Sequence, residues 1–197
     1  MNFALTKFVL SCYNPSQFPK NHIPEIAMIG RSNVGKSSII NSITKQKLLA
    51  KVSKTPGATQ CINFFNIENK KMLVDLPGYG YAQVPLKVKE NWEKLIISYI
   101  QHREQLDLCF LLLDAKVGIK ESDINVMKLL LNNNRKIMLL LTKCDKKLGS
   151  SVDHIIGSMQ TTLHQNNITN ITSENFVVTS ARKNYGIKDL QNIISNT

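Results

Sequence analysis

What this chain lacks narrows its class before any motif is considered. It has four cysteines, Cys12, Cys61, Cys109 and Cys144, which are widely spaced and form no C-x-x-C pair. This spacing argues against a metal site or a disulfide framework. Cys61 and Cys109 lie in apolar runs, where we expect buried thiols.

Targeting and membrane signals are also missing. No apolar run has the length needed to cross a bilayer. The apolar stretch near the N-terminus contains Lys7 and lacks a small-residue cleavage site, which is not typical of a signal peptide. We expect a cytosolic protein that makes no membrane contact and acts as a monomer.

Acidic residues are scarce, since 14 Asp and Glu stand against 25 Lys and Arg, a formal net charge of +11. This balance favours an anionic partner such as RNA or a membrane surface. The alternative is a compositional bias toward Lys, Asn and Ile over a solvated surface. The 197 residues, 43% of them hydrophobic, allow one α/β domain. We expect it at residues 24–197, with residues 1–23 as an extension that lays an extended segment on the core.

The most informative motif is a glycine-rich loop between a predicted strand, residues 25–29, and a predicted helix that begins near residue 36. The glycines let backbone N–H groups converge on a polyphosphate at a helix N-terminus. Within it, Lys36 would neutralise phosphate oxygens and the Ser37 hydroxyl would ligate Mg²⁺. The loop follows the pattern G-x-x-x-x-G-K-[ST] and comprises Gly30, Arg31, Ser32, Asn33, Val34, Gly35, Lys36, Ser37 and Ser38.

A second motif follows a polar, basic stretch at residues 45–60. Residues 61–67 and 72–74 predict a strand hairpin that delivers a D-x-P-G pattern, Asp75, Leu76, Pro77 and Gly78. A carboxylate there supports Mg²⁺, and Gly78 lets a backbone N–H approach a γ-phosphate. D-x-P-G alone is an ordinary turn, but about forty residues after a phosphate loop the two motifs support each other.

Two further segments predict a guanine pocket. The Asp145 carboxylate can accept from guanine N1–H and the exocyclic amine, a donor pair that adenine lacks, and the Lys143 stem can cover the ring. These residues belong to a T-K-x-D motif that ends a buried strand at residues 137–141, where open α/β sheets bind ligands: Thr142, Lys143, Cys144 and Asp145. A strand at 176–178 ends in a segment whose backbone could donate to guanine O6: Thr179, Ser180 and Ala181.

The remaining pattern alternates helices and strands. Helical stripes are predicted within residues 88–104, 124–131, 152–163 and 187–194, and residues 106–113 predict a buried strand that ends at Asp114. The four histidines belong to no catalytic constellation, and we expect them at the surface.

The motifs occur in the order of the translation-factor-like GTPases. Residues 30–38, 54–60, 75–82 and 142–145 look like the corresponding blocks of the EngB (YihA/YsxC) family of bacterial ribosome-biogenesis GTPases. The resemblance covers essentially the whole chain. It implies a three-layer α/β fold, the P-loop GTPase (Ras-like) domain, with a mostly parallel six-stranded sheet, one antiparallel edge strand and helices on both faces.

The resemblance also implies roles. Beyond the segments already named, Gly57, Ala58 and Thr59 would contact the nucleotide. Ser37 and Thr59 would ligate Mg²⁺, and Asp75 would support it through water, while Lys36, Thr59 and Asn33 would serve hydrolysis. GTP and GDP would be substrate and product, and the partner would be the large ribosomal subunit or its RNA.

Several positions depart from related GTPases. Ala58 stands where family members usually carry a basic residue, and Tyr79 stands where many GTPases place the Gln that orients water. Arg31 is more plausible as a structural residue than as an arginine finger. Asn33 is suggestive, because related GTPases with Asn here can recruit K⁺ near the β/γ bridge.

Three other classes remain open. A P-loop kinase or ATPase would have no use for Thr142–Asp145 and Thr179–Ala181. An RNA-binding protein that works independently of nucleotide would explain the net charge but would give the series of nucleotide-binding motifs no function. A membrane-traffic GTPase would need a lipid anchor, and Ile194–Thr197 contains no cysteine. Within the GTPases, regulation of cell division or another cytosolic process without ribosome contact is the alternative.

Overall fold

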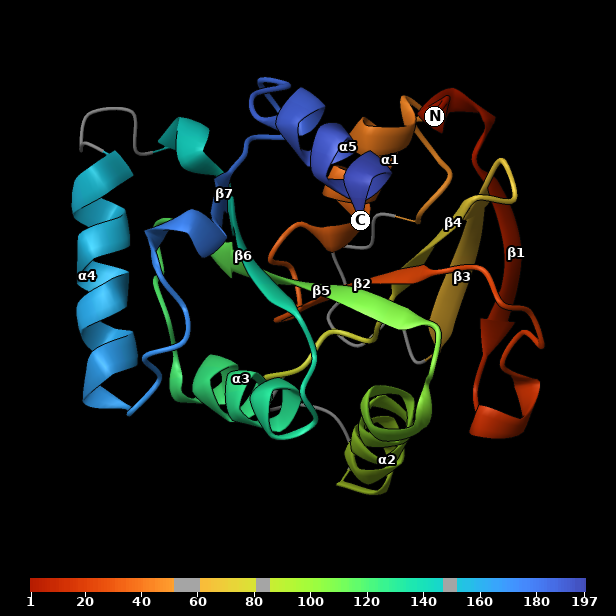
Figure 1. The fold of residues 1–197 in the computed structure, drawn as a ribbon, viewed down its shortest axis with the longest axis horizontal. Helices are drawn as coiled ribbons and strands as arrows, with labels where there is room; N and C mark the ends of the chain where they lie inside the picture. The colour runs from red at the N-terminus through yellow and green to blue at the C-terminus, as the bar shows by residue number, and fades with distance from the viewer. Residues whose placement is uncertain (52–60, 81–85, 147–151) are drawn as a thin grey trace.

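A seven-stranded sheet forms the centre of the computed structural model, which describes residues 1–51, 61–80, 86–146 and 152–197. Its strand order is β1-β3-β4-β2-β5-β6-β7 (Figure 1). The strands are β1 Lys7–Cys12, β2 Glu25–Gly30, β3 Ile62–Ile67, β4 Lys71–Asp75, β5 Leu106–Asp114, β6 Ile137–Thr142 and β7 Phe176–Val178.

The predicted fold class is confirmed, with one correction to the strand count. The sheet has seven strands and not six, because the extended segment expected at the N-terminus pairs with β3 as strand β1. β3 runs antiparallel to both of its neighbours, whereas β4, β2, β5, β6 and β7 are mutually parallel. The predicted antiparallel strand is therefore β3, which lies one position in from the edge.

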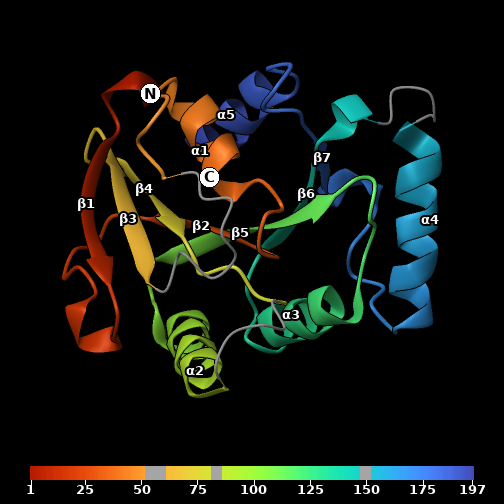
Figure 2. The same cartoon turned by 180° about the vertical axis from the view of Figure 1, so that it is seen from behind.

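Five helices among the described residues cover the two faces (Figures 1 and 2). Buried side chains of α1 and α5 belong to one apolar cluster, and those of α2, α3 and α4 belong to the other, so each face has its own core. The helices are α1 Lys36–Thr44, α2 Leu86–His102, α3 Glu121–Asn132, α4 Val152–Gln165 and α5 Ile187–Asn196.

The local sequence explains these elements. The central strand β2 is buried at all six positions, as expected of a parallel strand covered on both faces. The β3–β4 hairpin turns at Glu68 and Asn69, whose φ angles of 51° and 56° give the left-handed backbone that tight hairpins favour. All four cysteines are free and buried, which confirms the prediction for Cys61 and Cys109.

No helix among the described residues is long and apolar enough to cross a membrane. The four histidines are exposed, as predicted.

Candidate functional site

The predicted site segments converge at the carboxyl edge of the parallel strands. β2 lies between β4 and β5, and the register places Met28 beside Asp75 and Gly30 beside Leu112. β6 and β7 continue the same edge, with Asp114 beside Thr142. The order β4-β2-β5-β6-β7 therefore brings four segments to one edge of the sheet (Figure 1). These are the D-x-P-G turn, the phosphate loop, the T-K-x-D segment and residues 179–181, called here the S-A segment.

The phosphate loop turns tightly between β2 and α1. Asn33 and Gly35 have φ angles of 61° and 116°, and α1 begins directly afterwards at Lys36. A Cβ on Gly30 would lie 2.9 Å from the Leu112 carbonyl oxygen, so a side chain there would push the loop off β5. Left-handed turns of this kind let successive amides point toward one anion at a helix N-terminus.

A buried Lys36–Asp75 pair forms the floor of this loop. Lys36 Nζ donates to the Gly30 carbonyl oxygen at 3.3 Å. Burial lowers the pKa of Lys36, which Asp75 partly offsets, and burial raises the pKa of Asp75 to about 6, which Lys36 partly offsets. Each charge is costly to bury, and each moderates the cost of the other.

The Asp75 carboxylate fits the role expected of it near Mg²⁺. Among the described residues, Asp75 Oδ1 is buried without a hydrogen-bond partner, which indicates an acceptor built for a group outside the chain. A carboxylate and the half-buried Ser37 hydroxyl are the oxygen donors that Mg²⁺ prefers.

Gly78 lies against the phosphate loop. The Ser32 amide donates to the Tyr79 carbonyl oxygen at 3.0 Å. A Cβ on Gly78 would lie 2.9 Å from Ser32 Cα and 3.1 Å from Lys36 Nζ. The D-x-P-G turn therefore reaches the lysine and the loop backbone, as its predicted contact with a γ-phosphate requires, and only glycine allows this approach.

The T-K-x-D segment supports the phosphate loop from the other side. Thr142 Oγ1 donates to the Val34 carbonyl oxygen at 2.8 Å. Lys143 Nζ donates to the Asn33 carbonyl oxygen at 2.8 Å and forms an ion pair with Asp114 Oδ2, also at 2.8 Å. The lysine stem is thereby held across the end of β6, where it can cover a base.

The two base-reading segments are joined directly. Ser180 Oγ donates to Asp145 Oδ1 at 2.5 Å, across 35 positions of sequence. The Cys144 amide donates to the Thr179 carbonyl oxygen at 3.3 Å, and the Thr179 amide donates to that of Leu141 at 2.8 Å. These bonds fix the carboxylate of Asp145 relative to the backbone of the S-A segment.

Arg31 and Tyr79 both turn toward α3. Arg31 Nε lies 3.3 Å from Asp123 Oδ1, and Arg31 Nη2 donates to the Gly118 carbonyl oxygen at 2.8 Å. Tyr79 donates its hydroxyl to the same Asp123 oxygen at 2.7 Å, and burial raises its pKa well above the usual value. These contacts support the structural interpretation of Arg31. They also show that the Tyr79 hydroxyl is bonded to Asp123, at the position where many GTPases have Gln.

Some of the residues predicted to contact the nucleotide have side chains that are buried away from it. Val34, Leu76 and Cys144 are buried in the core, so they can contribute backbone only. The predicted residues Gly57, Ala58 and Thr59 lie outside the described residues.

Sequence reasoning missed two carboxylates, Asp114 and Asp123. Asp114 ends strand β5 beside Thr142, and the rule that sites lie at carboxyl ends of strands could have identified it. The third residue of a helix often carries an acidic capping side chain, which is the local signal for Asp123.

Comparisons with known proteins agree with this geometry. A family model described as 50S ribosome-binding GTPase matches residues 25–143, and one described as elongation factor Tu GTP binding domain matches residues 94–197. The chain is 54% identical over 140 residues to a probable GTP-binding protein EngB of Rickettsia akari, an alignment that covers 71% of this chain and 66% of that protein. It is 46% identical over 186 residues to a protein of the same name from Rickettsia canadensis, covering 94% and 82%.

Solved structures give the same result. The crystal structure of a probable GTP-binding protein engB matches with a TM-score of 0.71 at 26% identity, over 87% of this chain and 97% of that one. Aquifex aeolicus Era, crystallised with GDP and aluminium fluoride, matches with a TM-score of 0.67 at 20% identity, over 88% and 56%, and this likeness concerns the fold alone.

Proposed function

The chain belongs to the EngB family of GTP-binding proteins, and on that premise we propose that it hydrolyses GTP slowly and acts as a nucleotide-dependent switch in assembly of the large ribosomal subunit. The observation that supports the nucleotide part best is that Lys36, Asp75 and Asp145 lie at one edge of the sheet. The buried charges of Lys36 and Asp75 interact, and Ser180 bonds to Asp145. The description of the matching family model, a 50S ribosome-binding GTPase, supports the ribosomal part.

The proposed chemistry divides among the chain's own residues. The amides of residues 30–38 and Lys36 would hold the phosphates, while Ser37 and Thr59 would ligate Mg²⁺ and Asp75 would support the metal through water. When bound, Mg²⁺ supplies positive charge to the phosphate oxygens. Asp145 accepts from guanine, and Lys143 covers the ring.

Hydrolysis by the protein alone should be slow. Tyr79 stands where a water-orienting Gln would lie and is bonded to Asp123, and Arg31 is engaged by the same carboxylate. We expect a rate no faster than roughly 10⁻⁴ to 10⁻² s⁻¹, as for unassisted GTPases. Asn33 in the loop is the proposed K⁺ contact, and such an ion would add charge near the β/γ bridge.

Nucleotide competition tests the first half of the proposal. GTP and GDP, but not ATP, should displace a fluorescent guanine nucleotide from the protein. The reason is that adenine lacks the pair of donors from which the Asp145 carboxylate would accept hydrogen bonds. Equal displacement by ATP would contradict the guanine pocket and favour a kinase or ATPase.

Co-sedimentation with ribosomal particles tests the second half. The loops that carry Thr59 and Gly78 are the first and the second switch loop of this proposal. A γ-phosphate and Mg²⁺ would act on both together, so the GTP and GDP forms should present different surfaces. We expect the protein to sediment with large-subunit particles in a non-hydrolysable GTP analogue and to leave them in GDP. Sedimentation that ignores the nucleotide would contradict the switch and favour the alternative, a cytosolic role in cell division without ribosome contact.

The proposal also includes a cytoplasmic location and a monomeric state. Size-exclusion chromatography with light scattering in each nucleotide state measures the latter.

A further inference from the structure

A cavity of about 460 Å³ lies at the opposite edge of the sheet from the nucleotide site. Its walls are the segment between β1 and β2 and the end of α2 with the turn into β5, so it lies where β2 and β5 begin. The residues that line it include Phe18, Pro19, Lys20, His22, His102 and Arg103.

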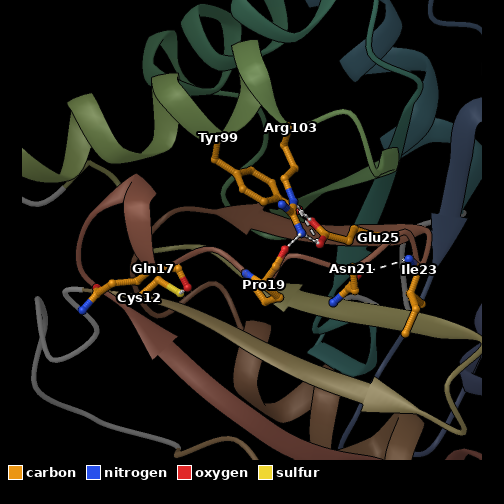
Figure 3. Close-up of polar contacts among 8 residues, drawn as sticks. All are labelled: Cys12, Gln17, Pro19, Asn21, Ile23, Glu25, Tyr99 and Arg103. Carbon is orange, nitrogen blue, oxygen red and sulfur yellow. Dashed lines mark hydrogen bonds and ion pairs between the residues drawn. The ribbon is translucent and has the colours of Figure 1, made fainter.

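Arg103, which lines this cavity, is held by a buried ion pair with Glu25 (Figure 3). Arg103 Nε donates to Glu25 Oε1 and Oε2 at 3.0 and 2.9 Å, and Tyr99 donates its hydroxyl to Oε2 at 2.8 Å. Arg103 Nη2 also donates to the Pro19 carbonyl oxygen at 2.8 Å, which ties the two walls together. The cavity is therefore preformed, because its two walls share one hydrogen-bonded cluster.

One wall is aromatic and apolar. The Phe18 ring packs edge-on against Tyr99 at 5.7 Å between centroids, and the Arg103 guanidinium lies 5.9 Å from the Phe18 centroid. Phe18 and Pro19 are half-buried, so each keeps part of its surface open to the cavity. Flat apolar surfaces next to cations are where nucleobases stack.

The rim carries the positive charge of Lys20 and two imidazole rings. Lys20, His22 and His102 are exposed, and none of the described residues that line the cavity is acidic. The negative end of α2 is also covered, because Arg135 Nε donates to the Ile100 carbonyl oxygen at 2.7 Å. Glu25 neutralises Arg103 beneath the wall, so the cation available to a ligand is Lys20. The imidazoles of His22 and His102 can donate an N–H to phosphate oxygens.

We propose that this cavity binds single-stranded RNA, with a base against Phe18 and Pro19 and backbone phosphates on Lys20, His22 and His102. An acidic peptide would satisfy Lys20 but would not use the Phe18 ring. The hydroxyl and amide side chains of Ser16, Asn21 and Gln105 can bond to base edges. The site deepens the proposed function by naming a second contact with the same RNA partner. Because it lies at the opposite edge of the sheet from the phosphate loop, binding there should not depend on the nucleotide.

The test uses the full chain and a fluorescein-labelled single-stranded RNA of mixed sequence, with fluorescence anisotropy measured in GDP and in a GTP analogue. Lys20→Glu with His102→Glu should weaken binding about tenfold or more and reduce the salt slope by about 0.7 for each phosphate that is no longer neutralised. Lys188→Glu with His164→Glu, on α5 and α4, makes the same charge changes at exposed positions and should leave the affinity within about twofold. All four side chains are exposed, and thermal melts check that the variants are folded.

The outcomes separate the two proposals. Equal RNA affinity of the cavity variant and its control overturns the cavity site. This holds whatever the result of the co-sedimentation with ribosomal particles. Displacement of the RNA by poly-glutamate at equal charge concentration overturns the choice of RNA. Sedimentation with ribosomal particles could prove independent of nucleotide while the cavity variant still binds RNA more weakly than its control. That result overturns the proposed switch and supports the cavity site.

Discussion

Asp145 is the residue on which base choice should depend. Ser180 donates to its Oδ1, which fixes the carboxylate where the guanine donor pair would meet it. Asp145→Asn keeps an acceptor for Ser180 but replaces the second acceptor with an NH₂ that pairs with the xanthine carbonyl. We expect weaker GTP binding and a relative gain for xanthosine triphosphate, measured by titration; unchanged GTP affinity would remove Asp145 from the pocket.

Asn33 is the residue on which the role of K⁺ should depend. Its carbonyl oxygen accepts from Lys143, while its side chain is exposed at the turn of the phosphate loop. Replacing K⁺ by Na⁺ at constant ionic strength should slow GTP hydrolysis, and Asn33→Ala should abolish that difference. Equal rates of the native protein in both salts would contradict K⁺ activation without touching the GTPase assignment.

Asp114 should link stability to acid pH. Burial alone would raise its pKa, but bonds from Lys143 Nζ and the Lys116 amide hold the pKa below its usual value of 3.8. A carboxylate whose pKa is lowered by folding stabilises the fold at pH values above its unfolded-state pKa. This contribution to the free energy of unfolding is lost as the pH falls through the folded-state pKa.

Asp114→Asn should therefore lower the unfolding temperature at pH 7, and the difference from the native protein should close below about pH 4. It should also weaken GDP binding a few-fold, since Lys143 loses its ion-pair partner. A deficit that persists unchanged at pH 3 would mean that packing, and not charge, explains the loss.

At the scale of elements, α3 is tied to the phosphate loop and to the D-x-P-G turn through Asp123. This fully buried carboxylate accepts hydrogen bonds from the Tyr79 hydroxyl and, at 2.8 Å, from the Lys120 amide at the start of the helix. It also forms an ion pair with Arg31. Asp123→Ala leaves the partly buried Arg31 without its counter-charge and should cost about 3 kcal/mol in unfolding free energy.

Tyr79→Phe is the milder test of the same element contact. It removes one donor while Arg31 and the Lys120 amide remain, so the cost should be about 1 kcal/mol. Denaturant unfolding of both variants checks the order. Equal losses would mean that the hydrogen bond from the Tyr79 hydroxyl, and not the ion pair of Arg31 with Asp123, accounts for the contact between the turn and α3.

The elements also show which parts of the fold the sequence could predict. The phosphate loop, the hairpin and strands β5 and β6 follow from local patterns, because apolar runs and glycine spacing act within a few residues. Strand β1 was expected only as an extended segment, since Lys7, Phe8 and Val9 are exposed and its pairing with β3 spans more than fifty positions.

The site divides in the same way. Lys36, Asp75 and Asp145 belong to contiguous motifs whose chemistry can be read without the fold. The pairing of Asp114 with Lys143, and of Arg31 with Asp123, arises only when separate strands and helices are packed together. Local sequence carries no signal for such distant partners beyond the presence of the charges.

At the scale of the whole molecule, the net charge of +11 must either serve an anionic partner or be compositional background. Lys45, Lys47 and Lys51 follow α1 on the way to the first switch, and all three are exposed. Lys54 lies outside the described residues, as do the side chains of Lys87 and Lys89 after the second switch.

If these lysines meet a phosphate backbone, binding to large-subunit particles should weaken steeply with salt, because each neutralised phosphate releases counterions. Sedimentation across a series of KCl concentrations, in GDP and in a GTP analogue, measures the slope. Lys51→Glu with Lys54→Glu should flatten it in the GTP form, whereas Lys128→Glu with Lys188→Glu, the same charge change on α3 and α5, should not. A flat response in the native protein would assign the charge to composition, since no set of phosphate contacts can be insensitive to salt.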